Sequence, residues 1–241
     1  MRATAFEFRN RVWFFAVLYG GSFSFFLVDH VPLGVRIGNR IAAATHWHER
    51  PALYLVFGTA ALVMVLASLI RTWGSAYLGR QVVHDRAVHS EALHADGPYR
   101  HVRNPLYFGN LLMALAIGVI APAAGFVFAV IAVTVFCYRL IGREEAALES
   151  EQGESYRAFK RAVPRLFPAL RPRLPAGGVT PDWGNGFASE AFFWSFALGV
   201  VGFAASLNIV FFYAGLAASP LLSWIAGVLL TKKRGTGSVL R

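Results

Sequence analysis

The sequence has few cysteines and few charged residues. Its 241 residues include one cysteine, Cys137, which excludes a framework of disulfides within the chain. Charged residues make up 15% of the chain and hydrophobic residues 56%. Water-soluble domains rarely have such a balance, whereas proteins with several membrane-spanning helices do. We therefore expect an all-α fold, a polytopic transmembrane helix bundle.

Common motifs of metal proteins and nucleotide-binding enzymes are missing too. No HExxH pattern occurs, and the 7 histidines show no zinc-type spacing with cysteine, so we expect no metal site. No glycine-rich nucleotide-binding loop follows a predicted strand. Any cofactor must therefore be held by helix ends and loops.

Acidic residues are scarce relative to basic ones. The chain has 13 Asp and Glu against 23 Lys and Arg, which gives a net charge of +10. A basic chain can bind nucleic acid, but here the Lys and Arg residues cluster beside apolar segments. Anionic lipid headgroups and the positive-inside rule explain that pattern better. The membrane bilayer is therefore the expected partner, and nucleic acid is not.

About six apolar segments are candidates for membrane spans, because a bilayer core needs roughly 20 apolar residues per helix. Pro122 separates the third segment from the fourth, so these two should form a tight helical hairpin. We expect a single integral membrane domain of residues 1–235. The candidate spans cover residues 12–28, 52–70, 106–121 and 123–141, and two helices within 187–230 that meet near 215–220.

The segments between the spans are more polar. Residues 29–50 are predicted to form a polar loop, and residues 71–104 a long segment on the cytosolic side. Residues 143–163 have apolar side chains at three- and four-residue steps, the pattern of an amphipathic helix. Such a helix lies at the membrane surface with its charged face in water.

The distribution of basic residues predicts how the chain crosses the membrane. Of the 23 Lys and Arg residues, only 3 lie between the first two spans and one, Arg139, lies within the fourth. The other 19 fall before the first span, in residues 71–104 and 142–186, and after the last span. Six spans with both termini in the cytosol put these 19 on the cytosolic side, as the positive-inside rule requires.

Two acids, Glu144 and Glu145, follow the fourth predicted span. The C-terminal end of a helix prefers cations, so adjacent acids there are unfavourable unless something neutralises them. Arg139 and Arg143 could do so, or the acids could bind a ligand. The plainer alternative is that the helix restarts here as the amphipathic segment.

Three stretches together resemble the isoprenylcysteine carboxyl methyltransferase family, which belongs to a wider group with membrane phospholipid methyltransferases. They are residues 96–109 (DGPYRHVRNPLYFG), the Glu144–Glu145 pair and residues 153–164 (GESYRAFKRAVP). The family pattern has a Gly-Pro-Tyr-Arg block that ends in Arg-His-Pro-x-Tyr, a helical hairpin, a Glu-Glu pair, and Gly-Glu-x-Tyr before Val-Pro. This sequence departs from it at Asn104, where the family usually has histidine. The resemblance covers about residues 52–170 and leaves out the C-terminal helices within 187–230.

The resemblance implies a site for S-adenosylmethionine. The expected catalytic residues are Glu144 and Arg139. Arg139 would face the acceptor's carboxylate, and Arg143 is the alternative for that contact. The amphipathic helix and its loop would form a lid over the cofactor. The residues expected to contact the cofactor are Leu93, His94, Tyr99, Arg103, Asn104, Pro105, Tyr107 and Glu144.

The implied activity is methyl transfer from S-adenosylmethionine to a lipid or lipidated acceptor at the cytosolic face. The family's name points to a carboxylate, as in protein isoprenylcysteine O-methylation, and a phospholipid headgroup is the alternative. Two other classes stay open: a non-catalytic membrane scaffold or transporter, and a membrane reductase with a nicotinamide cofactor. A transporter would favour ionisable residues deep in the spans, and we identify none in the second, third, fifth or sixth.

Overall fold

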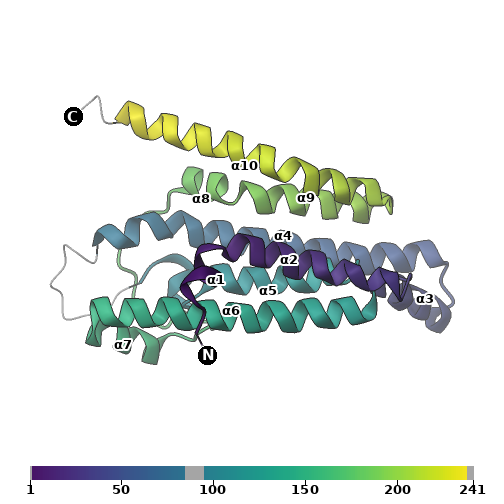
Figure 1. Cartoon of the computed structure of the whole chain (residues 1–241), viewed down its shortest axis with the longest axis horizontal. Coiled ribbons are helices and arrows are strands. Elements are labelled where there is room, and N and C mark those ends of the chain that lie inside the picture. Colours follow the sequence, from purple (N-terminus) through teal and green to yellow (C-terminus); the bar gives the residue numbers. More distant parts are fainter. Residues whose placement is uncertain (1, 85–94, 238–241) are drawn as a thin grey trace.

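The computed structural model describes residues 2–84 and 95–237, and this part of the chain is a bundle of helices with two isolated β-bridges (Figure 1). The expected all-α class is thereby confirmed. The helices are α1 (Ala5–Arg9), α2 (Arg11–Ser24), η1 (Phe25–Leu27), α3 (Leu33–Thr45), α4 (Glu49–His84), η2 (Gly97–Arg100), α5 (Pro105–Gly118), α6 (Ala123–Gln152), α7 (Glu154–Ala162), α8 (Trp183–Ser189), α9 (Ala191–Ser206) and α10 (Ile209–Gly237).

Three of the described helices are long and apolar enough to cross a membrane. They are α4 over Glu49–Leu78, α6 over Ala123–Gln152 and α10 over Ile209–Leu229. Helices α8 and α9 are bent by 68° relative to each other and form a fourth candidate when taken as one broken span. The apolar helices Arg11–Leu27 and α5 are shorter. A helical membrane bundle is therefore the fold, with three candidate spans among the described residues, or four with the broken one, where the sequence suggested about six.

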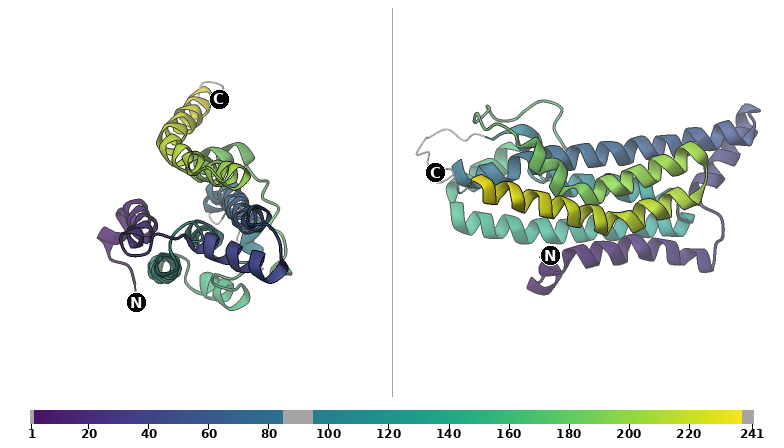
Figure 2. Two further views of the ribbon diagram at one scale, coloured as in Figure 1. Left: turned by 90° about the vertical axis from the view of Figure 1, so that its right-hand side faces the viewer. Right: turned by 90° about the horizontal axis from the view of Figure 1, so that it is seen from above.

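The long helices pack side by side in an order different from their order in the sequence. Helix α2 contacts α6, α6 contacts α5, α5 contacts α4, α4 contacts α9, and α9 contacts α10 (Figure 2). One apolar core lies between α4, α5, α9 and α10 and includes the buried Met64, Met113 and Val200. A second lies between α2, α5 and α6 around Val133 and Leu140. Helix α5 thus contributes to both cores.

The helical hairpin expected at Pro122 is present. Helix α5 ends at Gly118, and Pro122 occupies the N-cap position of α6. The start of α3 contacts the same turn through a hydrogen bond, in which Leu33 N donates to Ala121 O at 2.8 Å. The hairpin places the start of α5 and the far half of α6 at the same end of the bundle, opposite α3 (Figure 1).

Two segments predicted as loops are helical instead. Residues 29–50 contain α3, and α4 continues 14 residues beyond the predicted end of its span at residue 70, to His84. The polar residues Thr72 and Ser75 in this extension are buried. They pack against α8 and the bend that follows it, so protein contacts continue the helix where apolar sequence ends.

The predicted boundary between the fourth span and the amphipathic helix was wrong. Helix α6 runs without interruption through Glu144 and Glu145 to Gln152, so these acids do not lie at a helix end. The break comes at Gly153, whose φ of 60° favours glycine, and α7 is a separate helix. The unfavourable interaction of acids with a helix C-terminus therefore does not arise.

The break between the last two helices also differs from the prediction. It lies at Leu207, which adopts a left-handed conformation with φ 55°, and not near residues 215–220. Pro220 lies inside α10. Gly199 and Gly215 face each other so closely that a Cβ on Gly215 would lie 2.6 Å from the Gly199 Cα. This contact holds α9 and α10 against each other away from the turn at Leu207.

We predict that Gly125→Ala destabilises the bundle, because a Cβ there would lie 2.1 Å from the Ser22 carbonyl oxygen of α2. Helices α2 and α6 must separate to admit it, at a cost of about 1–3 kcal/mol. Thermal unfolding in detergent measures the change. Gly20→Ala is the matched control, because nothing lies within 4 Å of its Cβ. Equal melting temperatures for the two variants would contradict a close α2–α6 crossing.

Candidate functional site

Ala95 and the first part of the sequence motif, residues 96–104, lie alongside the connection 163–179, which we call the strap. Main-chain groups of the two segments pair along most of their length. The hydrogen bonds are Arg103 N to Pro164 O, Ala169 N to His101 O, Arg173 N to Arg100 O, Ala95 N to Pro175 O, and Gly177 N to Ala95 O. The motif therefore positions the strap as well as the start of α5.

Side chains of the motif add to this pairing. The buried Asp96 carboxylate accepts hydrogen bonds from the backbone N–H groups of Gly177, Gly178 and Val179 at 3.0, 3.2 and 3.1 Å. Asn104 Nδ2 donates to Arg165 O at 2.9 Å. The amide at position 104, where the family usually has histidine, thus holds the strap in this structure.

Arg103 is occupied by contacts within the protein. Its Nε and Nη2 donate to the Glu145 carboxylate at 3.0 and 2.9 Å, and its Nη1 donates to the carbonyl oxygens of Lys160 and Val163, both at 2.6 Å. An arginine has five N–H groups, and four hydrogen bonds are made here. The other Glu145 oxygen pairs with Arg165 at 2.8 Å. Arg103, Glu145 and Arg165 therefore form one ion network that joins the start of α5 to α6, α7 and the strap.

Glu144, next to Glu145, lies in a different environment. The Tyr107 hydroxyl donates to Glu144 Oε1 at 2.8 Å, which joins α6 to the first turn of α5. Among the described residues, its second oxygen accepts no hydrogen bond. The Arg11 guanidinium of α2 is near enough for its charge to act on this carboxylate. Within the described part of the chain, Glu144 is thus an acid held on one side, by Tyr107.

The other predicted site residues are spread around this pair. Pro105 is the first residue of α5 and is buried, as expected for a helix start. Tyr99 is buried with its hydroxyl 3.5 Å from Gly74 O, and burial together with the Glu144 and Glu190 carboxylates raises its pKa. Arg139 pairs with Glu7 of α1 at 2.7 Å. Leu93 and His94 lie outside the described residues.

The structure therefore brings some of the predicted residues together and not others. Tyr107 and Glu144 are in contact, and Tyr99 lies close enough for the Glu144 charge to reach it. Arg103 contacts Glu145, which was not among the predicted cofactor contacts. Arg139 forms its ion pair with the N-terminal segment.

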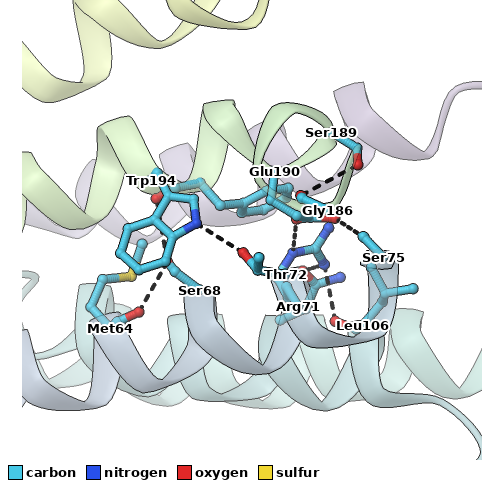
Figure 3. A network of polar contacts seen from close by, with 12 residues as sticks. Met64, Ser68, Arg71, Thr72, Ser75, Leu106, Gly186, Ser189, Glu190 and Trp194 are labelled. Atoms are coloured by element: carbon cyan, nitrogen blue, oxygen red, sulfur yellow. Dashed lines mark hydrogen bonds and ion pairs between the residues drawn. The ribbon is translucent and has the colours of Figure 1, made fainter. Parts of the chain in front are cut away.

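A second buried polar cluster was not expected from the sequence. Arg71 of α4 and Glu190, at the bend between α8 and α9, form an ion pair of 2.7 Å with side chains 10% and 4% exposed (Figure 3). Ser75 Oγ donates to the other Glu190 oxygen at 2.5 Å. Arg71 Nη1 donates to Leu106 O and to Asn110 Oδ1 of α5. The cluster therefore ties α4, α5 and the C-terminal helices together.

The signal for this cluster was present but was interpreted differently. In the sequence, Arg71 directly follows the predicted span 52–70, and Glu190 lies near the start of the apolar region 187–230. Both are buried, at 8% and 3% exposure, and Arg71 lies inside the candidate span Glu49–Leu78. Ionisable residues at such positions are buried only with a partner. A single basic residue beside one apolar segment and a single acid beside another can therefore be predicted to form a buried ion pair.

Comparison with known families identifies the core of the bundle. Residues 55–154 match the model of a family described as phospholipid methyltransferase. The family is part of the isoprenylcysteine carboxyl methyltransferase-like group, so the resemblance drawn from the motifs is confirmed. The match supports a membrane methyltransferase, and it includes Tyr107, Glu144 and Arg71 but neither the strap nor Glu190. Comparisons with curated proteins and with solved structures give no match.

We predict that Arg103→Ala destabilises the protein strongly, by about 3–5 kcal/mol, because it leaves the buried Glu145 without its main partner. Glu144→Gln should change stability little, since an amide still accepts the Tyr107 hydrogen bond. Thermal unfolding of both variants in the same detergent compares them. If Arg103→Ala melts like Glu144→Gln, the ion network does not hold the strap.

A double-mutant cycle at the second cluster gives another expected outcome. Arg71→Met and Glu190→Leu each leave one buried charge unpaired and should cost about 3–5 kcal/mol. The double variant buries two apolar groups and should recover most of that loss. Unfolding free energies of the four proteins measure the coupling. Additive losses in the double variant would mean that the two side chains are independent.

Proposed function

We propose that the protein is an integral membrane methyltransferase that uses S-adenosylmethionine as methyl donor and a lipid or lipidated molecule as acceptor. The observation that carries the proposal is the Tyr107–Glu144 contact inside the segment that matches the methyltransferase family. Tyr107 lies in the first turn of α5 and Glu144 in the far half of α6, so the contact joins the two helices away from the turn at Pro122. A carboxylate with one unused oxygen is the kind of group that binds a cationic cofactor.

The chemistry of these residues fits the proposed methyl donor. S-adenosylmethionine carries an ammonium, a sulfonium and two ribose hydroxyls, and Glu144 can bind any of these through the oxygen that Tyr107 leaves unused. The carboxylate of S-adenosylmethionine suits the first turn of α5, because the Asn104 side chain does not cap that turn. Arg103 was expected to contact the cofactor, but its guanidinium makes four hydrogen bonds within the protein. We therefore assign Arg103 to holding the site and Glu144 to the cofactor.

When bound, the cofactor would supply the methyl group on its sulfur, and an acceptor atom would take that methyl group by displacing the sulfur. An acceptor carboxylate or phosphate oxygen needs no general base, so the protein's contribution is alignment and removal of water. Tyr107 fixes the Glu144 carboxylate against α5, and the buried Tyr99 adds an apolar wall with one hydroxyl. If the acceptor atom is an amine, its proton must be removed, and Glu144 and Glu145 are candidate bases.

Two acceptor chemistries follow from different observations. The sequence motifs favour a carboxylate such as that of an isoprenylated cysteine, and Arg139 or Arg143 would then bind it. The matched family is described as phospholipid methyltransferase, which favours a phospholipid headgroup. In both cases the hydrophobic tail would reach the site sideways from the lipid between helices.

The expected topology is part of the proposal. The Tyr107–Glu144 pair and the ends of α6 and α7 would face the cytosol, together with both termini, and α3 would face the other side. The charge distribution supports this orientation: 19 of the 23 Lys and Arg residues fall in the segments assigned to the cytosol. In the structure α3 lies at the opposite end of the bundle from α7 (Figure 1).

Calorimetry with the purified full chain tests the proposal. S-adenosylhomocysteine should bind, and Glu144→Gln should weaken it about ten- to a hundredfold, the effect of losing one charge-assisted hydrogen bond. Glu151→Gln, an exposed acid on the same helix, is the control and should bind normally. Saturable NADPH binding without S-adenosylhomocysteine binding would reject the methyltransferase in favour of a reductase.

Transfer assays then separate the acceptors. Labelled methyl groups should appear on a prenylcysteine carboxylate if the first acceptor is right, and on phosphatidylethanolamine in vesicles if the second is right. Labelling of neither, by a protein that binds the donor, would reject both acceptors.

A further inference from the structure

The first residues of the chain lie across α6 and are held there by polar contacts. Ala3 N donates to Arg139 O at 2.9 Å, and Arg143 Nη1 donates to Ala3 O at 3.2 Å. The Glu7 carboxylate accepts from Arg139 Nη2 at 2.7 Å to each of its oxygens. The Thr4 backbone N–H and the Arg139 guanidinium hold the pKa of Glu7 below its usual range, so this acid is charged at neutral pH.

Three arginines gather where this segment meets α6. Besides Arg139, the Arg143 guanidinium lies 5.7 Å from the centre of the Phe8 ring, and that of Arg11 lies 4.7 Å from the same ring. Glu7 is the one acid among residues 2–11. The arginine surface, as we call Arg139 and Arg143 of α6, thus meets a single acid of the segment, and the Glu7 carboxylate bound to Arg139 shows that it accepts an anion.

Apolar packing against the second core holds this segment through two side chains, those of Ala3 and Phe8. Helix α1 buries none of its residues, and of residues 2–11 only Ala3 is buried, at 4% exposure. Phe6 is 61% exposed and Trp13, just beyond the segment, is 73% exposed. Removing the segment from α6 therefore breaks a few polar contacts and the Ala3 and Phe8 contacts with the second core, and it leaves the core between α4, α5, α9 and α10 intact.

The same segment fits a lipid surface. Arg2, Arg9 and Arg11 are exposed, and they lie on either side of the exposed Phe6 and of Glu7 in the sequence. Basic and aromatic residues on a short helix next to a membrane span favour the interface, and anionic lipids attract it further. Residues 2–11 therefore have two competing partners: α6, through Glu7, and an anionic membrane surface, through their arginines.

We propose that residues 2–11 form a cover that leaves α6 when the membrane carries anionic lipids, whose headgroups then bind Arg139 and Arg143 in place of Glu7. The exposed site lies beside Glu144, on which the Arg11 charge acts in the covered form. The suggestion that such a headgroup is also the methyl acceptor depends on the proposed function. The departure of residues 2–11 from α6 does not depend on it.

Cysteine labelling of the full chain in nanodiscs tests the cover. Ala3→Cys places a thiol in a position that is 4% exposed when the segment is docked, and the native Cys137 is 0% exposed and should stay unlabelled. A water-soluble maleimide should react slowly in phosphatidylcholine. Adding phosphatidylglycerol should raise the rate about two- to fivefold, the range expected when a partly exposed ion pair is lost. Unchanged rates in the two lipids would overturn the proposal.

Charge variants of the labelled protein isolate the contact. Glu7→Gln and Arg139→Gln should each label fast in phosphatidylcholine alone. Glu154→Gln removes an acid from an exposed ion pair on α7, alters net charge as Glu7→Gln does, and should label like the parent. Glu7→Gln labelling no faster than Glu154→Gln would show that the pair does not close the cover. Glycerol phosphate in solution should not open it; opening by that anion would reject a lipid surface as the ligand. Labelling needs no methyl donor, so a failure here is separate from a failure of the methyltransferase assignment.

Discussion

The Arg103–Glu145 ion pair is the contact on which the architecture of this site depends. Its side chains are 8% and 6% exposed, so neither charge can rely on water. Such a pair is stable only when the remaining donors and acceptors are also satisfied. Here that requires the last carbonyl groups of α7, supplied by Lys160 and Val163, and the Arg165 guanidinium of the strap. The pair therefore fixes the paths of α7 and the strap relative to the hairpin.

The same contact separates two neighbouring acids into different roles. Adjacent residues of a helix point about 100° apart, so Glu145 and Glu144 cannot face the same partner. Glu145 pairs with two arginines, whereas the hydrogen bond that Glu144 makes within residues 2–84 and 95–237 is the one from the Tyr107 hydroxyl. An acid pair that looks symmetrical in the sequence thus consists of one residue that holds the structure and one that remains able to bind a ligand.

The sequence predicted the helical class, the hairpin at Pro122 and the family, because these depend on apolar content, local breakers and motif order. It did not predict where α6 ends. The apolar periodicity continues through Gly153, and only the conformation of that glycine interrupts the helix. The role of Arg103 was also missed, since its partners Glu145 and Lys160 are 42 and 57 residues away. Arg71 and Glu190 could be paired only by their shared need for burial, which a local pattern does not display.

The Arg71–Glu190 pair has a consequence for how the protein is made. The two residues are 119 positions apart, so the ribosome delivers α4 well before the acid that neutralises its arginine. Until α8 and α9 follow, Arg71 lies in an apolar helix with only the Leu106 carbonyl and Asn110 as partners. Chains grow at about 5–20 residues per second, so this helix waits for several seconds. The membrane insertion machinery must therefore retain α4 and α5 until the last helices arrive. The pair thus makes assembly of the family-matched core depend on a part of the chain that lies outside the match.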